Sequence, residues 1–182
     1  MHYADIKQYD VANGPGVRIS LFVSGCTHHC KGCFNEEAWD FSYGKPFTQQ
    51  EIAWILESLE LDYIAGLTIL GGEPFEPANQ QGILPLVEQV RKQYPQKTIW
   101  CYSGYDFEKD ILGRMWENCP ATKSILEKID VLVDGKFIEE EKNINLRFKG
   151  SANQRIIQVP QSLKSGKIVL WNPEYTVKEW RE

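Results

Sequence analysis

The chain has 182 residues, 42% of them hydrophobic and 25% charged, a composition typical of a globular protein long enough to bury a core. Its formal net charge of −5 provides no basic field for a phosphate backbone, which argues against nucleic acid as a partner. There is neither an apolar run of about 20 residues nor a signal peptide at the N-terminus. We therefore expect a cytoplasmic protein that does not cross a membrane, folded as a single domain over residues 1–182.

The first strong pattern along the chain is a strand that leads into a cysteine-rich loop. After a turn at Asn13–Gly16, residues Val17–Val23 are β-branched, aromatic or alternating and predict a strand. The strand is followed by Cys26, Cys30 and Cys33, spaced C-x3-C-x2-C. The five cysteines are odd in number and clustered, which favours reduced, metal-binding thiols over a disulfide framework.

The cysteine loop alone is compatible with two kinds of metal site. Three thiolates suit a [4Fe–4S] cluster, and because such a cluster normally takes four, three would leave one iron open for chemistry. The same thiolates suit a structural zinc ion with His28 or His29 as the fourth ligand. The loop does not decide between these sites.

Helices and strands alternate through the rest of the chain. A capping box at Thr48–Glu51 predicts a helix to about Leu59, and the apolar spacing predicts a second helix near Ile83–Tyr94 with Pro85 in its first turn. Further helical segments are predicted at Phe107–Trp116 and Thr122–Lys128. Ile6–Asp10 reads only as a short mixed segment. Strands are predicted at Gly66–Leu70, Thr98–Tyr102, Val131–Val133, Arg155–Val159 and Lys167–Trp171.

This alternation predicts an α/β fold, an open partial (βα) barrel with about four βα units and a short C-terminal β extension. A closed barrel of eight units needs about 250 residues, more than this chain has. Four motifs follow the predicted parallel strands: the cysteine loop, Gly71–Pro74, Ser103–Gly104 and Asp134–Lys136. We expect them to meet at one rim, where α/β folds place their chemistry.

Two motifs together resemble the radical S-adenosylmethionine (SAM) superfamily. These are C-x3-C-x2-C followed by the aromatic Phe34, and the turn Gly71-Gly72-Glu73-Pro74 after the second core strand. The resemblance implies that the open barrel is of the radical SAM type, with one [4Fe–4S] cluster per chain and SAM as the cosubstrate.

Three further segments narrow the resemblance. The stretch Asp10–Arg18 resembles the glycyl-radical-enzyme activases. Within that group, the small size of the chain, the Asn13–Arg18 part of this stretch, the loop Ser24–Cys30 and the late segment Lys149–Arg155 are similar to the activating proteins of anaerobic ribonucleoside-triphosphate reductase.

The resemblance implies roles for the residues around the cluster. Cys26, Cys30 and Cys33 are expected to bind three irons as the catalytic and metal-binding residues, leaving the fourth iron to the amino and carboxylate groups of SAM. Gly32, Cys33 and Phe34 are expected beside the adenine.

It also implies roles for two later turns. Gly71 and Gly72 lack a Cβ and let the backbone approach the ligand, Glu73 or nearby backbone oxygens accept from the methionine ammonium, and Pro74 stiffens the turn. Asp134 and Lys136 match an Asp-x-Lys of related activases, in which the lysine meets the methionine carboxylate.

The implied activity is that of an oxidoreductase. With an electron from flavodoxin or ferredoxin, SAM is cleaved to methionine and a 5′-deoxyadenosyl radical. This radical abstracts hydrogen from a glycine of anaerobic ribonucleoside-triphosphate reductase and so generates its glycyl radical. In this group the partner protein supplies the substrate, which is consistent with so short a chain.

Other functions stay open at this point. One is a radical SAM enzyme acting on a small molecule, similar to the deazaguanine synthases, and another is an activase of a different glycyl radical enzyme. The third is a zinc-stabilised binding module or electron carrier, in which the Gly-Gly-Glu-Pro turn would have no function. Arg18 could contact the partner or anchor a strand, and His28, His29 and the 149–155 segment could have ordinary loop roles.

Overall fold

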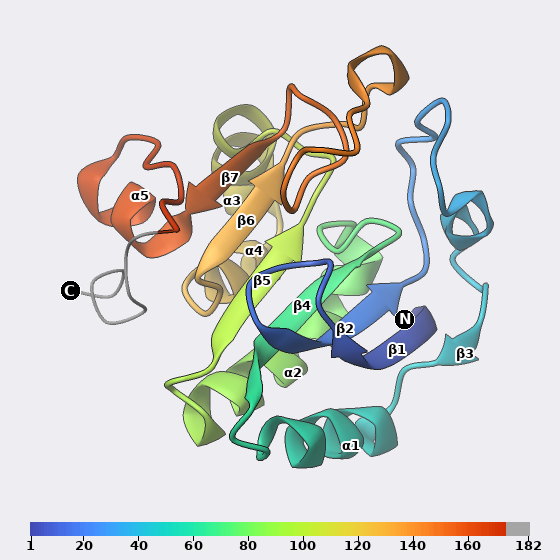
Figure 1. Cartoon of the computed structure of the whole chain (residues 1–182), viewed down its shortest axis with the longest axis vertical. Coiled ribbons are helices and arrows are strands. Elements are labelled where there is room, and N and C mark those ends of the chain that lie inside the picture. Colours follow the sequence, from blue (N-terminus) through green and yellow to red (C-terminus); the bar gives the residue numbers. More distant parts are fainter. Residues whose placement is uncertain (174–182) are drawn as a thin grey trace.

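A seven-stranded mixed sheet forms the centre of the fold (Figure 1). The computed structural model describes residues 1–173. The strand order is β3-β1-β2-β4-β5-β6-β7, in which β2, β4, β5 and β6 are parallel and the other three strands are antiparallel to their neighbours. The strands are β1 (His2–Asp10), β2 (Val17–Val23), β3 (Lys45–Pro46), β4 (Ile64–Gly71), β5 (Thr98–Tyr102), β6 (Val131–Asp134) and β7 (Arg155–Gln158).

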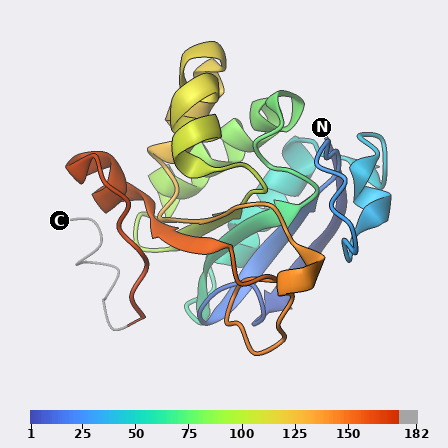
Figure 2. The same cartoon turned by 90° about the horizontal axis from the view of Figure 1, so that it is seen from above.

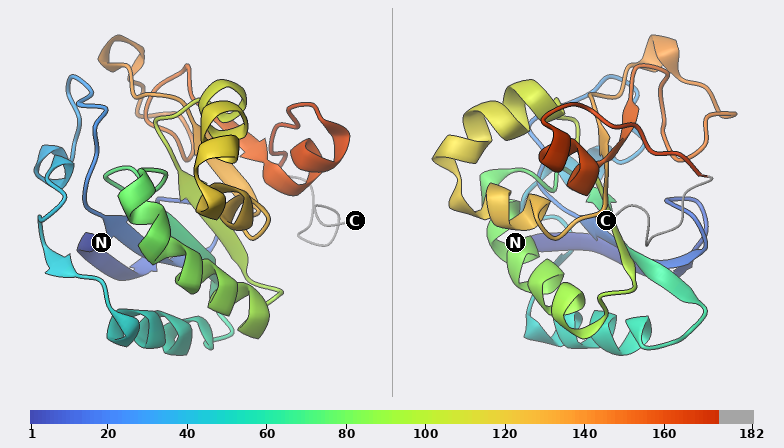
Figure 3. Two further views of the ribbon diagram at one scale, coloured as in Figure 1. Left: turned by 180° about the vertical axis from the view of Figure 1, so that it is seen from behind. Right: turned by 90° about the vertical axis from the view of Figure 1, so that its left-hand side faces the viewer.

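Helical segments connect the parallel strands and cover one face of the sheet (Figure 3). The α-helices are α1 (Gln49–Leu59), α2 (Pro77–Gln93), α3 (Trp116–Asn118), α4 (Pro120–Leu126) and α5 (Val159–Ser165). A π-helix at Phe107–Met115 precedes α3, and short 3₁₀ helices lie at Glu36–Trp39 and Glu139–Glu141. Three helical crossovers join the four parallel strands, one fewer than the four βα units expected, because only the 3₁₀ turn and a loop follow β6 before β7.

The strongest local signals form the elements that they predict. β2 has the predicted bounds, and six of its seven residues are buried. The capping box begins α1: the Thr48 hydroxyl accepts from the Gln50 N–H at 3.2 Å, and the Glu51 carboxylate accepts from the Thr48 N–H at 2.7 Å. The apolar stripe of α1 then packs against the sheet.

The two faces of the sheet are covered differently. The helical face holds the larger apolar core, which Leu67 and Ile69 of β4 join. The opposite face carries a smaller cluster centred on Trp100, packed edge-on by Phe148 and Trp171. Seen from above, α2 and the helical segment 107–126 lie on one side of the sheet and the 136–150 segment lies on the other (Figure 2).

Arg18 is buried on this second face, which excludes direct contact with a partner. Its side chain is 0% exposed, and its guanidinium donates to the Thr68 hydroxyl at 2.7 Å, to the Leu67 carbonyl at 2.7 Å and to both oxygens of Thr98 at 2.9 and 3.0 Å. A fifth bond reaches the Pro15 carbonyl at 3.3 Å and ties down the turn before β2. Burial lowers the pKa of Arg18 to about 10. The residue therefore anchors strands.

The predicted bounds of two elements in the N-terminal half, β1 and α2, are wrong. Ile6–Asp10 belongs to a full strand, β1, which pairs with β2 although its polar sequence gives a weak strand signal. Helix α2 begins at Pro77 rather than near Ile83, so Pro85 lies inside it. The helix tolerates Pro85 because the missing N–H would have bonded Gln81, which lies on the exposed side.

The C-terminal prediction is also corrected. Arg155–Gln158 forms β7 as expected, but the next element is the unpredicted helix α5, with Pro160 in its first turn and Gly166 as its left-handed cap. The predicted strand Lys167–Trp171 is reduced to a single bridge between Leu170 and Ile157. Among the described helices, none combines the length and apolar character needed to span a bilayer.

Candidate functional site

The loops that follow the four parallel strands meet at one cavity of about 380 Å³. The strand ends are bonded to one another: the Gly72 N–H donates to the Val23 carbonyl at 2.7 Å, and the Ser103 N–H donates to the Val133 carbonyl at 2.8 Å. All four strand-end motifs contribute to the wall, as the parallel arrangement predicts. The cavity has the size typical of a small-molecule site.

The three clustered cysteines all line this cavity. Cys26, Cys30 and Cys33 are free thiols, as are the remaining two cysteines of the chain. Cys101 and Cys119 are buried in the helical-face core and do not line the cavity. The site thus offers three thiols and no fourth.

Backbone N–H groups point at the sulfur atoms of these cysteines. Burial raises the pKa of the Cys26 thiol to about 11, and backbone N–H groups of His28 and His29 oppose that rise. Burial likewise raises the pKa of Cys30, opposed by the Phe137 N–H and by the Lys136 charge. The Asn35 N–H lies 3.5 Å from the Cys33 sulfur. Without a metal the two shifted thiols stay protonated at neutral pH, and metal binding would displace their protons.

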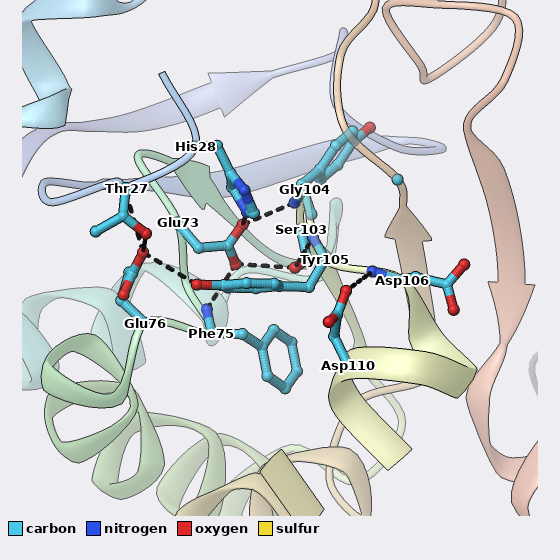
Figure 4. A network of polar contacts seen from close by, with 12 residues as sticks. Thr27, His28, Glu73, Phe75, Glu76, Ser103, Gly104, Tyr105, Asp106 and Asp110 are labelled. Carbon is cyan, nitrogen blue, oxygen red and sulfur yellow. Dashed lines mark hydrogen bonds and ion pairs between the residues drawn. The ribbon is translucent and has the colours of Figure 1, made fainter. Parts of the chain in front are cut away.

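Two buried polar side chains at the start of α2 hold the cysteine loop: Glu76, the residue before the helix, which Figure 4 shows, and Asn79 in its first turn. The Glu76 carboxylate accepts from the Thr27 backbone N–H at 3.0 Å and from the Tyr105 hydroxyl at 3.2 Å. The Asn79 amide donates to the carbonyl oxygens of Gly25 at 3.2 Å and Glu73 at 2.9 Å. These bonds fix the loop before any ligand binds.

The predicted residues of the Gly-Gly-Glu-Pro turn lie at the cavity with one exception. Gly71, Gly72 and Glu73 line it, whereas Pro74 does not. A Cβ on Gly71 would lie 2.7 Å from the Val23 carbonyl oxygen, so only glycine permits the close approach of β4 to β2 here.

Gly32 and Phe34, on either side of Cys33, both line the cavity but differ in their surroundings. Gly32 lines the cavity and packs against Glu139 of the segment after β6. Phe34 also lines the cavity, yet its side chain is 83% exposed. Lys31 completes this contact between segments through ion pairs with Glu139 at 3.0 Å and Glu140 at 3.3 Å.

Asp134 and Lys136 are not among the residues that line the cavity. The buried Asp134 carboxylate accepts from the Phe107 N–H at 2.9 Å and from the Arg155 Nε at 3.0 Å. Lys136 is exposed, but its charge acts on the Cys30 thiol. The 149–155 segment holds the turn between them, since the Gln154 amide donates to the Gly135 carbonyl at 2.9 Å.

Comparison with known proteins identifies the family. The model of a 4Fe–4S single cluster domain matches residues 12–157. The anaerobic ribonucleoside-triphosphate reductase-activating protein of Vibrio cholerae is 42% identical over 158 residues, covering 86% of this chain and 97% of that protein. The proteins of the same name from Pasteurella multocida and Escherichia coli K12 are 40% and 38% identical, over 88% and 85% of this chain and 99% and 96% of their own lengths.

The chain belongs to the family of anaerobic ribonucleoside-triphosphate reductase-activating proteins. The 4Fe–4S domain match supports an iron–sulfur cluster in this family member. The residues at the cavity fit such a group, because soft thiols from one loop reach one cavity and backbone N–H groups already point at their sulfur atoms.

Much of the cavity wall consists of residues that the sequence did not predict to be part of the site. The wall also includes Tyr102 of β5 and several residues of the segment after β6, among them Phe137, Lys142, Leu146, Phe148, Lys149 and Gly150. That segment is charged and irregular, so no local pattern distinguishes its inward side chains. The similarity of Lys149–Arg155 to the activating proteins was the one available signal.

Proposed function

We propose that this chain is a radical SAM activase that generates the glycyl radical of anaerobic ribonucleoside-triphosphate reductase. Family membership supports the reductase as the target. The observation that carries the proposal is the set of three free cysteines, from one loop, at a cavity that no fourth cysteine lines. Three protein ligands would leave one iron of a [4Fe–4S] cluster for SAM.

The sheet supports the more specific assignment to an open, partial barrel of the radical SAM type. Four parallel strands end at the cavity, and in the described residues the edge strands β3 and β7 do not pair with each other. An open side suits an enzyme whose substrate is a glycine in another protein. We take residues 1–182 as one radical SAM domain.

The chain's own residues would bind and orient the reactants. Cys26, Cys30 and Cys33 would hold three irons, and Gly71 and Gly72 would let the backbone of the turn approach SAM. When bound and reduced, the cluster would supply the electron for the reductive cleavage of SAM, the chemistry that the removal of hydrogen from the glycine requires. The protein's task is to align the reacting atoms and to exclude water and competing reactions.

Several finer assignments belong to the same proposal. Gly32, Cys33 and Phe34 would lie beside the adenine, with Phe34 at the exposed rim. Lys136 would meet the methionine carboxylate by turning its exposed side chain toward the site. Flavodoxin or ferredoxin would supply the electron, and the protein would act in the cytoplasm.

Anaerobic reconstitution tests the proposal in two steps. The purified chain should bind about four irons and four sulfides and should cleave SAM when dithionite is added. Mixed with the reductase, it should then give a glycyl radical signal by electron paramagnetic resonance. One zinc with no sulfide would rule out the cluster, and SAM cleavage without a radical on the reductase would rule out the partner.

A further inference from the structure

The Glu73 carboxylate has four polar partners within the protein. Its Oε1 accepts from the Phe75 N–H at 2.8 Å and from the Ser103 hydroxyl at 2.9 Å. Its Oε2 accepts from the Gly104 N–H at 2.7 Å and lies 3.0 Å from the Nε2 of His28 (Figure 4). Four partners fill the acceptor positions of the two oxygens.

These bonds leave the carboxylate unsuited to a ligand contact. Glu73 is 1% exposed, although it contributes to the cavity wall. To accept from the methionine ammonium, as the resemblance implies, its carboxylate would have to break at least one buried hydrogen bond, which leaves a donor unsatisfied. The bonds tie together the loops after β2, β4 and β5.

His28 is the more exposed partner of the His28–Glu73 pair. It lines the cavity, as Glu73, Ser103 and Gly104 also do, with 11% of its side chain exposed against 1% for Glu73. Its ring packs directly on Gly104, where a Cβ would come within 2.5 Å of the ring carbon Cδ2, and it meets the Tyr105 ring at 4.3 Å and 61°. With Nε2–H donating to Glu73, the imidazole has one fixed position in the wall.

We propose that His28 contacts SAM in the cavity and that Glu73 is a positioning residue that acts through His28 instead of binding SAM itself. The proposal rests on the proposed function for the identity of the ligand. The proposal differs from the sequence analysis, in which His28 could have an ordinary loop role and the resemblance implied that Glu73 or nearby backbone oxygens accept from the methionine ammonium.

Glu73 also lies close to a cluster ligand. Its backbone N–H donates at 2.9 Å to the carbonyl oxygen of Gly25, the residue before Cys26, and its negative charge acts on the Cys26 thiol. A buried charge beside a cluster ligand is one of the features that set the reduction potential of an iron–sulfur cluster. Replacing Glu73 with the neutral Gln is therefore expected to raise the midpoint potential, and this can be measured without SAM.

A double-mutant cycle tests the route from Glu73 to SAM. The dissociation constant of SAM is measured by equilibrium binding to anaerobically reconstituted wild type, Glu73→Gln, His28→Ala and the double variant. We expect each single change to weaken binding about tenfold, the loss of one hydrogen bond, and the double variant to bind no more weakly than His28→Ala. Multiplied losses in the double variant would overturn the proposal, because Glu73 would then contact SAM on its own.

The cluster without SAM gives an independent measurement. Glu73→Gln should raise the midpoint potential and alter the paramagnetic resonance spectrum of the reduced protein, whereas Glu88→Gln, an exposed change on α2, should alter neither. An unaltered spectrum and potential in Glu73→Gln would contradict the effect of the Glu73 charge on the cluster. If wild type bound no SAM at all, the proposed function would fail, yet this measurement would still report on Glu73.

Gly104→Ala keeps the proposal testable should Glu73→Gln not fold. The added Cβ displaces the His28 ring while leaving the Glu73 charge in place. We expect it to weaken SAM binding as His28→Ala does, with a midpoint potential close to that of the wild type. Wild-type affinity in Gly104→Ala would show that the ring position does not matter. Iron content and circular dichroism establish that each variant is folded and loaded.

Discussion

The side-chain nitrogen of Asn79 lies 3.2 Å from the carbonyl oxygen of Gly25. The same nitrogen lies 2.9 Å from the carbonyl oxygen of Glu73, so one buried amide joins the cysteine loop to the turn after β4. Helix α2 thereby holds together two adjacent loops, both of which contribute to the cavity wall. Its first turn supports the site as well as the core.

Asn79→Asp replaces the shared donor with an acceptor that faces two carbonyl oxygens. We expect the variant to lose about 2–4 kcal/mol of unfolding free energy, because the carbonyls of Gly25 and Glu73 would each keep one backbone donor but lose the amide, and the new buried carboxylate would face both oxygens without a partner. Urea unfolding of the cluster-free protein measures this. Asn118→Asp is the matched control, since that amide also donates to a carbonyl, of Arg114 at 2.7 Å, but is exposed. Equal losses in both variants would contradict the importance of burial at Asn79.

Cys30→Ser should abolish stable cluster binding, because the site would keep only two thiolates. Iron and sulfide analysis after reconstitution measures the loss, and SAM cleavage should disappear with it. Cys119→Ser is the control: its thiol lies on the helical face, 3.3 Å from the Gln80 side-chain oxygen, and a hydroxyl can keep that contact. A full cluster in Cys30→Ser would show that the ligand set is wrong.

The sequence predicted correctly those helices and strands whose own residues show a clear local pattern. Val17–Val23 is apolar along its length and Thr48–Glu51 is a complete cap, so β2 and the start of α1 were predicted correctly. β1 was missed because its half-exposed, polar residues become a strand only by pairing with β2. Hydrogen bonding to β2, a contact that local sequence patterns do not reveal, makes β1 a strand.

The candidate site, like the fold, was predicted only in part from the sequence. The cysteine spacing predicted a loop whose three thiols do share one cavity. Glu76 and Asn79 were missed because they lie before the predicted helix near Ile83–Tyr94, where polar residues ordinarily mark an exposed loop. In the structure they are buried, since the cysteine loop brings backbone donors and acceptors against the start of α2.

Gly71→Ala should destabilise the protein more than Gly135→Ala. Both glycines have positive φ, +108° and +101°, so alanine is strained at each. A Cβ on Gly71 would also lie 2.7 Å from backbone of Val23, whereas on Gly135 its nearest neighbour is 3.6 Å away. We expect an additional loss of about 1–3 kcal/mol at Gly71, measured by thermal or urea unfolding. Equal losses would mean that φ strain alone decides both positions.

Arg18→Lys tests whether the buried guanidinium can be replaced by another cation. A lysine has three donors on one atom and cannot reach acceptors on both β4 and β5, so buried oxygens of Thr68 and Thr98 would lose partners. We expect a loss of about 2–4 kcal/mol of unfolding free energy. Arg114→Lys, at an exposed position, should change stability by less than about 0.5 kcal/mol. A small effect at Arg18 would contradict its anchoring role.

Cys101 gives the protein a dependence on alkaline pH that is separate from the cluster. Burial raises the pKa of its thiol well above the ordinary value of 9.0. In the unfolded chain the thiol ionises near pH 9 while the folded protein keeps it neutral, so its contribution to stability is complete below pH 9 and is lost as pH rises further. The advantage of the wild type over Cys101→Ala should therefore fall by about 1.4 kcal/mol for each pH unit above 9. Urea unfolding of both cluster-free proteins in reductant, from pH 7 to 11, measures this difference, and a difference that stays constant would show that the buried thiol is not the titrating group.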